Sequence, residues 1–203
     1  MKQNNKNMPK KIAVTGGIGS GKSKVLSILQ EKGFPVFSCD EIYKDIIRRP
    51  DYVLEIGRIF PKVIENGEIN RAYLAQIIFN DEEKRKALNA VAHPFIMREL
   101  FERMNGVNSY KVFAEVPLLF EGNFEKLFDD VWVVDRAVET RIEAIAERDG
   151  LNRTKIEQRM SAQFPYQTDE GMARIKECGA KIIKNEGSLI ALSDKIEKLL
   201  DIK

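Results

Sequence analysis

The sequence has little of the chemistry that anchors proteins in membranes or holds metal ions. No apolar run approaches the roughly 20 residues needed to span a bilayer. Its two cysteines, Cys39 and Cys178, and its single histidine, His93, lack the spacing of a zinc site. We therefore expect no membrane partner, free thiols and a cytoplasmic location.

An excess of charge of one sign is also absent. Lys and Arg together number 33 against 31 Asp and Glu, a net charge of +2, so no overall field favours nucleic acid as a partner. Any anion must be held by a local cluster of residues. Residues 1–10 are polar, rich in Asn and Lys, and without the apolar segment of a signal peptide, which predicts a flexible N-terminal tail.

The strongest positive signal is a phosphate-binding loop. Residues 16–23 read GGIGSGKS and fit the pattern G-x-x-x-x-G-K-S/T, between a β-branched run and a segment with helical apolar spacing. The alternative is an ordinary glycine turn, but such a turn would rarely match the fixed positions of the pattern together with the flanking strand and helix. Lys22 should reach the β- and γ-phosphates of ATP, and the Ser23 hydroxyl should ligate Mg²⁺. The predicted nucleotide-binding residues of the loop are Gly17, Ile18, Gly19, Ser20, Gly21, Lys22, Ser23 and Lys24.

Short apolar runs separated by segments of helical periodicity predict an α/β fold. Parallel strands with helices on both faces of the sheet produce this alternation. The five predicted strands are 12–14, 35–39, 111–115, 131–134 and 180–183. They predict one domain over residues 11–203, built on a parallel five-stranded sheet.

Two mostly helical segments interrupt the alternation. Residues 41–110 are too many for a simple crossover and predict a helical substrate lobe. Residues 137–174 carry interleaved acidic and basic side chains, which fit either a solvated helix pair or a lid whose arginines close over a transferred phosphoryl group.

The run at 34–40 ends on Asp40. Because the carboxyl ends of neighbouring parallel strands line the ligand crevice, this carboxylate should face the phosphates, where it could accept a proton or help to hold Mg²⁺. The alternative is that Asp40 only caps the helix that follows. The segment by itself does not decide between the two.

Several further motifs occur in order along the chain, and together they resemble those of dephospho-CoA kinases. The two most specific are TGGIGSGKS at 15–23 and VPLLFE at 116–121. The supporting pieces are Asp40, His93-Pro94, Arg148-Asp149-Gly150, residues 159–163 and Asn185-Glu186-Gly187. The resemblance spans residues 11 to about 190.

This resemblance implies a three-layer P-loop kinase fold and ATP-dependent phosphorylation of the ribose 3′-hydroxyl of dephospho-CoA, the final step of coenzyme A synthesis. It makes Asp40 the general base and places Asn185 near the adenine. Either Arg148 or Arg141 would stabilise the transferred phosphoryl group, because Ala144 stands where the family often has an arginine. ATP and Mg²⁺ are the implied cofactors, and the expected assembly is a monomer or weak homo-oligomer.

Other functions share some of these features. Another nucleoside or nucleotide kinase would use the same core on a different acceptor, whereas a nucleotide-dependent switch would have no base such as Asp40 aimed at an acceptor. Arg48, Arg49, Arg71 and residues 84–86 could attract a diphosphate, or could simply be surface charge. His93, which precedes a proline, should be extended and mark a helix start, where it could be either a structural hinge or a contact to the substrate.

Overall fold

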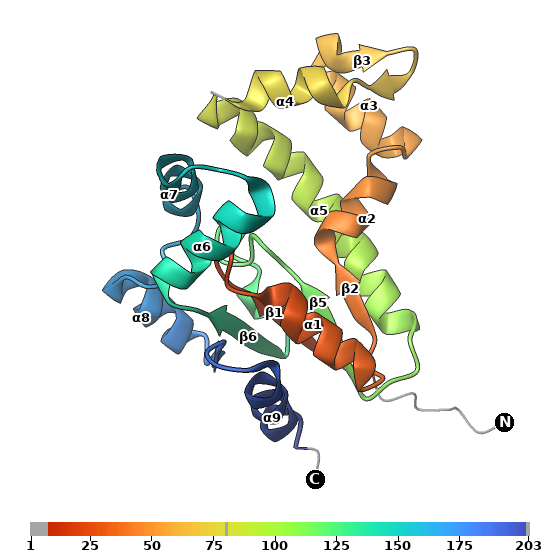
Figure 1. Cartoon of the computed structure of the whole chain (residues 1–203). Coiled ribbons are helices and arrows are strands. Elements are labelled where there is room, and N and C mark those ends of the chain that lie inside the picture. The colour runs from red at the N-terminus through yellow and green to blue at the C-terminus, as the bar shows by residue number, and fades with distance from the viewer. Residues whose placement is uncertain (1–7, 80, 202–203) are drawn as a thin grey trace, which may run out of the picture. The chain divides into compact units, whose positions relative to one another are not determined.

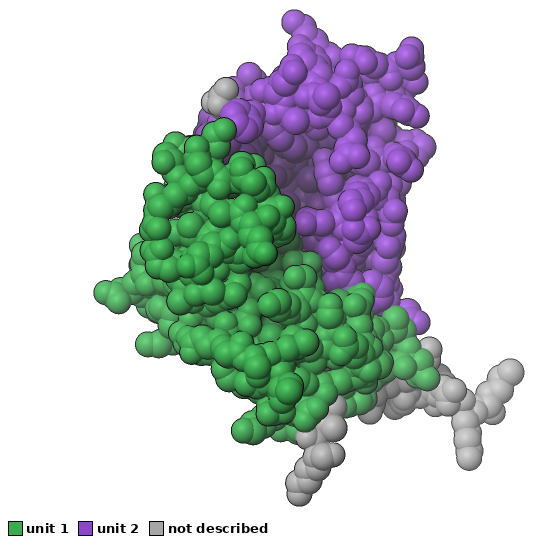
Figure 2. Space-filling view, viewed as in Figure 1, with its two compact units in different colours: residues 1–36, 107–203 green, residues 37–106 purple. Residues whose placement is uncertain are grey.

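The computed structural model describes residues 8–79 and 81–201. Most of the predicted tail, residues 1–7, lies outside the described residues, and Lys10 already belongs to the first strand. The described residues form two compact units by their internal contacts, one of residues 1–36 and 107–203 and the other of residues 37–106 (Figure 2). No helix within the described ranges is long and apolar enough to cross a membrane.

The first unit is built on the predicted parallel sheet (Figure 1). The strands of the sheet are β1 (Lys10–Thr15), β2 (Val36–Ser38), β5 (Lys111–Glu115), β6 (Asp130–Asp135) and β7 (Lys181–Lys184), in the order β2-β5-β1-β6-β7, and the boundary between the two units falls within β2. Central β1 pairs in parallel with β5, where Ile12 lies opposite Phe113, and with β6, where Val14 lies opposite Trp132. All five strands lie within two residues of their predicted positions.

Helices α1 (Lys22–Glu31) and α9 (Leu189–Leu200) pack together on one face of this sheet. Alternate strand residues point to that face, among them Ile12 and Trp132, each 1% exposed. Trp132 packs on Phe113 with ring centroids 5.1 Å apart. Burial of this apolar surface fixes the start of α1, and with it the loop that precedes α1.

The remaining helices of this unit follow β5 and β6. They are η2 (Glu125–Leu127), α6 (Val138–Asp149), α7 (Arg153–Ser161) and α8 (Asp169–Glu177). The charged segment 137–174 therefore contains three helices rather than a pair. Gly150, with φ of +64°, ends α6, and the Asn152 side chain caps α7 by accepting from the Lys155 N–H.

The second unit is mostly helical, as predicted for the substrate lobe. It contains α2 (Cys39–Ile46), α3 (Pro50–Ile59), η1 (Pro61–Val63), β3 (Ile64–Glu65), β4 (Glu68–Ile69), α4 (Arg71–Phe79) and α5 (Glu82–Gly106). Strands β3 and β4 form an antiparallel hairpin that the sequence reading missed. Its turn is Asn66-Gly67, with φ of +50° and +80°, and Asn-Gly is a strong hairpin signal.

The expectation of a helix start at His93-Pro94 is wrong. Pro94 lies inside α5, which continues on both sides of it. A proline in a helix removes one backbone hydrogen bond, but Ala92, Met97 and Leu100 of α5 are buried. Their packing stabilises the helix across the proline. Burial also lowers the pKa of His93 from its usual value.

Candidate active site

The phosphate-binding loop joins β1 to α1, as the sequence predicts. Gly21 directly precedes α1 with φ of +91°, a conformation that side chains rarely adopt. A Cβ on Gly21 would lie 2.1 Å from Nδ2 of Asn185, so glycine is also required for this close approach. Glycine is therefore required at residue 21 for two reasons: its positive φ and its close approach to Asn185.

Several backbone N–H groups of the loop are already used within the protein. Ser20 donates to the Gly17 carbonyl at 3.1 Å, and Ile18 donates to Oε1 of Gln163 at 2.8 Å. The N–H groups of Gly19, Gly21 and Ser23 have no acceptor among the described residues. Together with the positive end of the α1 dipole, they form the part of the loop that can bind an anion.

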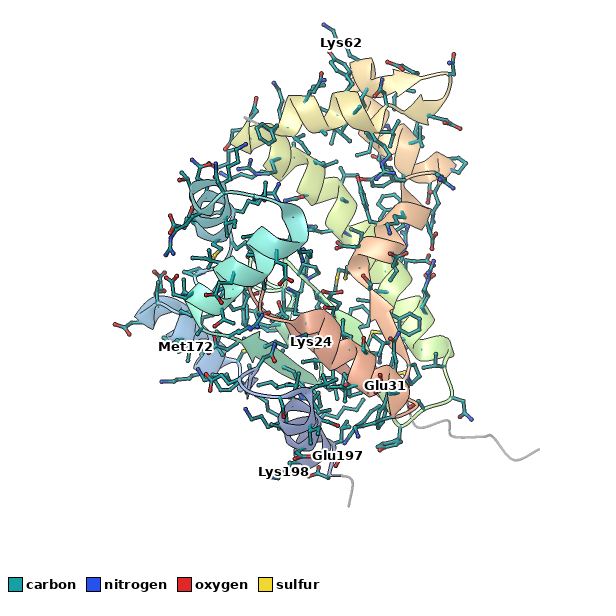
Figure 3. All side chains as sticks on the ribbon, viewed as in Figure 1. Lys24, Glu31, Lys62, Met172, Glu197 and Lys198 are labelled. Atoms are coloured by element: carbon teal, nitrogen blue, oxygen red, sulfur yellow. The ribbon has the colours of Figure 1, made fainter. Side chains whose placement is uncertain are left out.

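The side chains at the start of α1 differ in their surroundings. Nζ of Lys22 folds back onto the loop and donates to the carbonyl oxygens of Gly16 at 2.9 Å and Gly17 at 3.4 Å. Ser23 and Lys24 are exposed, Lys24 on the outer side of α1 (Figure 3). The Lys24 N–H donates to the Gly21 carbonyl at 3.0 Å.

Arg141 of α6 lies against this loop. It is only 6% exposed, and its Nε donates to the Ile18 carbonyl at 2.8 Å. No carboxylate among the described residues lies within ion-pair distance of it. Burial lowers the pKa of the guanidinium, yet an arginine remains protonated at neutral pH. A buried positive charge therefore lies beside the phosphate-binding loop without an ion pair among the described residues, although the more distant carboxylate of Asp135 raises its pKa and partly offsets the effect of burial.

Arg148 has a different environment. Its side chain is 61% exposed, and its Nε and Nη2 make a bidentate pair with Asp149 at 2.7 and 2.9 Å. Asp149 also lies 3.5 Å from Arg159. Of the two arginines that the sequence left unranked, Arg141 is therefore the one that contacts the loop.

Asn185 follows β7 and supports the loop from its other side. Its Nδ2 donates to the Ser20 carbonyl at 2.7 Å, and its backbone N–H donates to the Asp135 carbonyl at 2.8 Å. Asp135 accepts hydrogen bonds from Lys184 and Gln167. Burial alone would raise the pKa of Asp135, but these bonds outweigh it and hold the pKa below its usual value.

Residues 163–167, which we call the crossing segment, tie the loop to the 116–121 stretch. Besides the bond between Gln163 and Ile18, the Phe164 N–H donates to Oε1 of Glu121 at 2.8 Å. The Tyr166 hydroxyl lies 2.9 Å from Oγ1 of Thr15, and burial raises the pKa of that phenol. The sequence analysis places residues 164–167 only within the helix pair or lid of residues 137–174. The Phe-Pro-Tyr run at 164–166 is the one signal that could have marked these contacts.

Asp40 belongs to the other unit. It lies in the first turn of α2 and is exposed, and the N-cap position is occupied by Ser38. The alternative reading of Asp40 as the helix cap is therefore wrong, because β2 ends two residues before it. Asp40 follows the carboxyl end of a sheet strand, the edge at which open parallel sheets bind ligands.

A phosphate-binding loop between the first strand and first helix of a five-stranded parallel sheet defines a P-loop nucleotide-binding protein. The dephospho-CoA kinase family model matches residues 10–190. A dephospho-CoA kinase of Thermus thermophilus is 34% identical over 189 residues, which cover 93% of this chain and 89% of the relative. This chain belongs to the dephospho-CoA kinase family, whose members are ATP-dependent kinases.

Solved structures agree with this assignment. A crystal structure from Thermus thermophilus has a TM-score of 0.79 at 33% identity and covers 96% of this chain and 98% of that one. The dephospho-CoA kinase of Campylobacter jejuni has a TM-score of 0.60 at 25% identity, covering 96% and 97%.

Proposed function

We propose that this protein transfers the γ-phosphoryl group of ATP to the ribose 3′-hydroxyl of dephospho-CoA, giving coenzyme A and ADP. The observation that carries the proposal is Arg141, which is buried beside the phosphate-binding loop and forms no close ion pair among the described residues, since a buried charge without a close partner is destabilising. A bound triphosphate would supply negative charge next to this guanidinium.

The loop residues would hold the β- and γ-phosphates. The unpaired N–H groups of Gly19, Gly21 and Ser23 supply donors, and Lys22 would exchange the Gly16 and Gly17 carbonyls for phosphate oxygens. The Ser20 hydroxyl is buried without a hydrogen-bond partner among the described residues, as expected of a loop shaped around a ligand.

Mg²⁺ fits the exposed Ser23 hydroxyl. Mg²⁺ in such enzymes keeps several waters and uses few protein ligands besides phosphate oxygens, and no cluster of three metal-ligating side chains is found in the described part of the chain. When bound, the ion would neutralise charge on the phosphates. Ser23 would orient it.

Asp40 would accept the proton of the ribose 3′-hydroxyl as the oxygen attacks the γ-phosphorus. Its carboxylate is exposed, and it follows the carboxyl end of β2. Asp40 is therefore accessible to an acceptor, which the base in this reaction must contact directly.

Arg141, rather than Arg148, would stabilise the charge of the transferred phosphoryl group. The guanidinium keeps donors free after bonding Ile18, whereas Arg148 is committed to Asp149 in solvent. Electrostatic stabilisation is worth most where water is excluded, which again favours the buried arginine.

The proposed lid is restricted by the contacts at its ends. Arg141 near its start and the crossing segment near its end are both bonded to the loop or to strand ends. The part between them, from the end of α6 through α7, would close over the reacting group and exclude water.

Mass spectrometry of the product tests this function. After incubation with ATP, Mg²⁺ and dephospho-CoA, we expect the acceptor to gain one phosphoryl group, and NMR should place it at the 3′-oxygen. Nucleosides and nucleoside monophosphates serve as competing acceptors. Preferential phosphorylation of one of these would make the protein a different P-loop kinase, and omission of Mg²⁺ tests the metal requirement.

A further inference from the structure

The second unit contains a small, partly enclosed pocket beside the β3–β4 hairpin. Its volume is about 250 Å³, and two arginines, Arg48 and Arg71, line it together with Glu68. Val53 and Ile69 supply apolar lining. Whole small molecules occupy pockets of about 300–1,000 Å³, so this pocket suits one segment of a larger ligand.

The two arginines of this pocket differ from most others in the unit. Arg49, Arg58, Arg98 and Arg103 each have a carboxylate within 4.0 Å. Neither Arg48 nor Arg71 has one among the described residues, although Glu68 lines the same pocket. Two guanidinium groups that share a pocket without ion pairs are suited to bidentate recognition of phosphate oxygens.

The position of Arg48 matches the chemistry of the acceptor. Asp40 lies at the start of α2, and Arg48 lies two residues beyond its end at Ile46. With a rise of about 1.5 Å per residue, the backbone positions of Asp40 and Arg48 are on the order of 12 Å apart. The long arginine side chain can shorten the distance between its guanidinium group and the Asp40 carboxylate. In dephospho-CoA the 5′-diphosphate is attached to the same ribose as the reacting 3′-hydroxyl, so one acceptor molecule could reach both residues.

We propose that the pocket formed by Arg48 and Arg71 binds the diphosphate of the acceptor. This inference rests on the proposed function, because it takes dephospho-CoA as the molecule whose ribose meets Asp40. Glu68 opposes the anion and weakens its binding. Because the two arginines outnumber this one carboxylate, the pocket still favours an acceptor that carries a diphosphate over a plain nucleoside.

Steady-state kinetics of single charge variants test the assignment. We expect Arg48→Gln and Arg71→Gln each to raise the KM for dephospho-CoA about tenfold, while the KM for ATP stays unchanged and kcat changes less than about twofold. Glu68→Gln should lower the KM for dephospho-CoA. The matched control is Lys62→Gln, which removes an exposed charge of the same unit outside the pocket and should change nothing (Figure 3).

Adenosine separates recognition of the diphosphate from a general disturbance of the unit. It carries the same 3′-hydroxyl without the diphosphate, so its inhibition constant should be the same in the wild type and in both arginine variants. An unchanged KM for dephospho-CoA in both variants would overturn the proposal, as would an equal loss of adenosine affinity.

Calorimetric titration of dephospho-CoA in the absence of ATP distinguishes failure of this inference from failure of the proposed function. If the wild type turned over no dephospho-CoA but bound it about tenfold more tightly than the arginine variants, the result would support diphosphate binding by the pocket and overturn the proposed reaction. Equal binding by wild type and variants would overturn the pocket. Absence of binding to the wild type would overturn both.

Discussion

Gly17 and Arg141 lie so close together that a Cβ on Gly17 would stand 2.3 Å from Nη2 of Arg141. The same arginine donates to the carbonyl of the next residue, Ile18. The guanidinium therefore packs on the backbone of the loop, and the absence of a side chain at residue 17 makes this possible. The cation and the loop form one arrangement that a change at either residue would disturb.

Gly17→Ala and Arg141→Gln should therefore lower kcat by related mechanisms. We expect a fall of about 10²-fold or more for Arg141→Gln, because a charge that stabilises the transition state is lost, and a smaller fall for Gly17→Ala, which displaces the guanidinium. In the double variant the two losses should be less than additive. Steady-state kinetics of the three variants measure this.

Arg148→Gln is the matched control, since it makes the same substitution two turns further along α6. Its kcat should stay within about threefold of wild type, because surface ion pairs contribute little. A large fall in Arg148→Gln together with normal turnover in Arg141→Gln would reverse the assignment of the two arginines.

Asp40→Asn should lower kcat by about 10²- to 10⁴-fold, the usual range for loss of a general base. Asparagine is a far poorer proton acceptor of the same size. Because Ser38 occupies the N-cap position, the expected loss of stability is limited to the interaction of the carboxylate with the helix dipole, about 0.3–1 kcal/mol. Turnover and circular-dichroism melting should be measured on the same samples. Normal kcat would place the base elsewhere.

Asn185→Ala removes the hydrogen bond to the Ser20 carbonyl that supports the loop. We expect a KM for ATP raised about three- to tenfold, since one neutral hydrogen bond contributes about 0.5–1.5 kcal/mol. The KM for dephospho-CoA should not change. Competition between ATP and GTP adds a second readout, because a residue that contacts the adenine would alter base preference and a residue that only supports the loop would not.

Hydrogen exchange can locate the moving part of the 137–174 segment. With an ATP analogue and dephospho-CoA bound, residues 149–162 should exchange more slowly, because closure excludes water from the phosphoryl group. In the crossing segment, the amides of Gln163, Phe164 and Tyr166 should be protected already in the free protein, because each donates a hydrogen bond within the described structure. Equal exchange of residues 149–162 in both states would show that they do not close.

Asp135 should make the protein sensitive to acid. Because its folded-state pKa is lowered, it contributes stability above its unfolded pKa of about 3.9, and this contribution is lost as pH falls through the lower folded-state value. Asp135→Asn should flatten the fall in melting temperature below about pH 5. Lys184→Gln, which removes the cation that pairs with Asp135, should have a similar but smaller effect.

Much of this architecture follows from local sequence patterns. Five apolar runs located the strands, and eight residues located the phosphate-binding loop, because in both cases the required residues are neighbours in sequence. Pro94 predicted a helix start from local sequence alone. The helix instead continues through the proline, because buried residues of α5 pack against other parts of the protein, and this packing is not visible in the local sequence. The Asn66-Gly67 hairpin was readable from sequence and was missed.

The ranking of Arg141 over Arg148 was beyond the sequence. The two are separated by about two turns of one helix, so both project from the same side of α6. They differ only in what lies opposite: Arg141 meets the loop and Arg148 meets solvent. The position of Asp40 in α2 was also beyond the sequence. Whether Asp40 caps the helix or lies in its first turn depends on where β2 ends, and β2 ends at Ser38, two residues before Asp40.

The buried Trp132 has a practical consequence for such measurements. It is the only tryptophan in the chain, and it lies in the core of the first unit against Phe113. Its fluorescence is therefore a built-in optical probe of the sheet, and the unit that carries Asp40, Arg48 and Arg71 has no such chromophore. Melting followed by emission would be blind to separate unfolding of that unit, which a second, engineered tryptophan there would make visible.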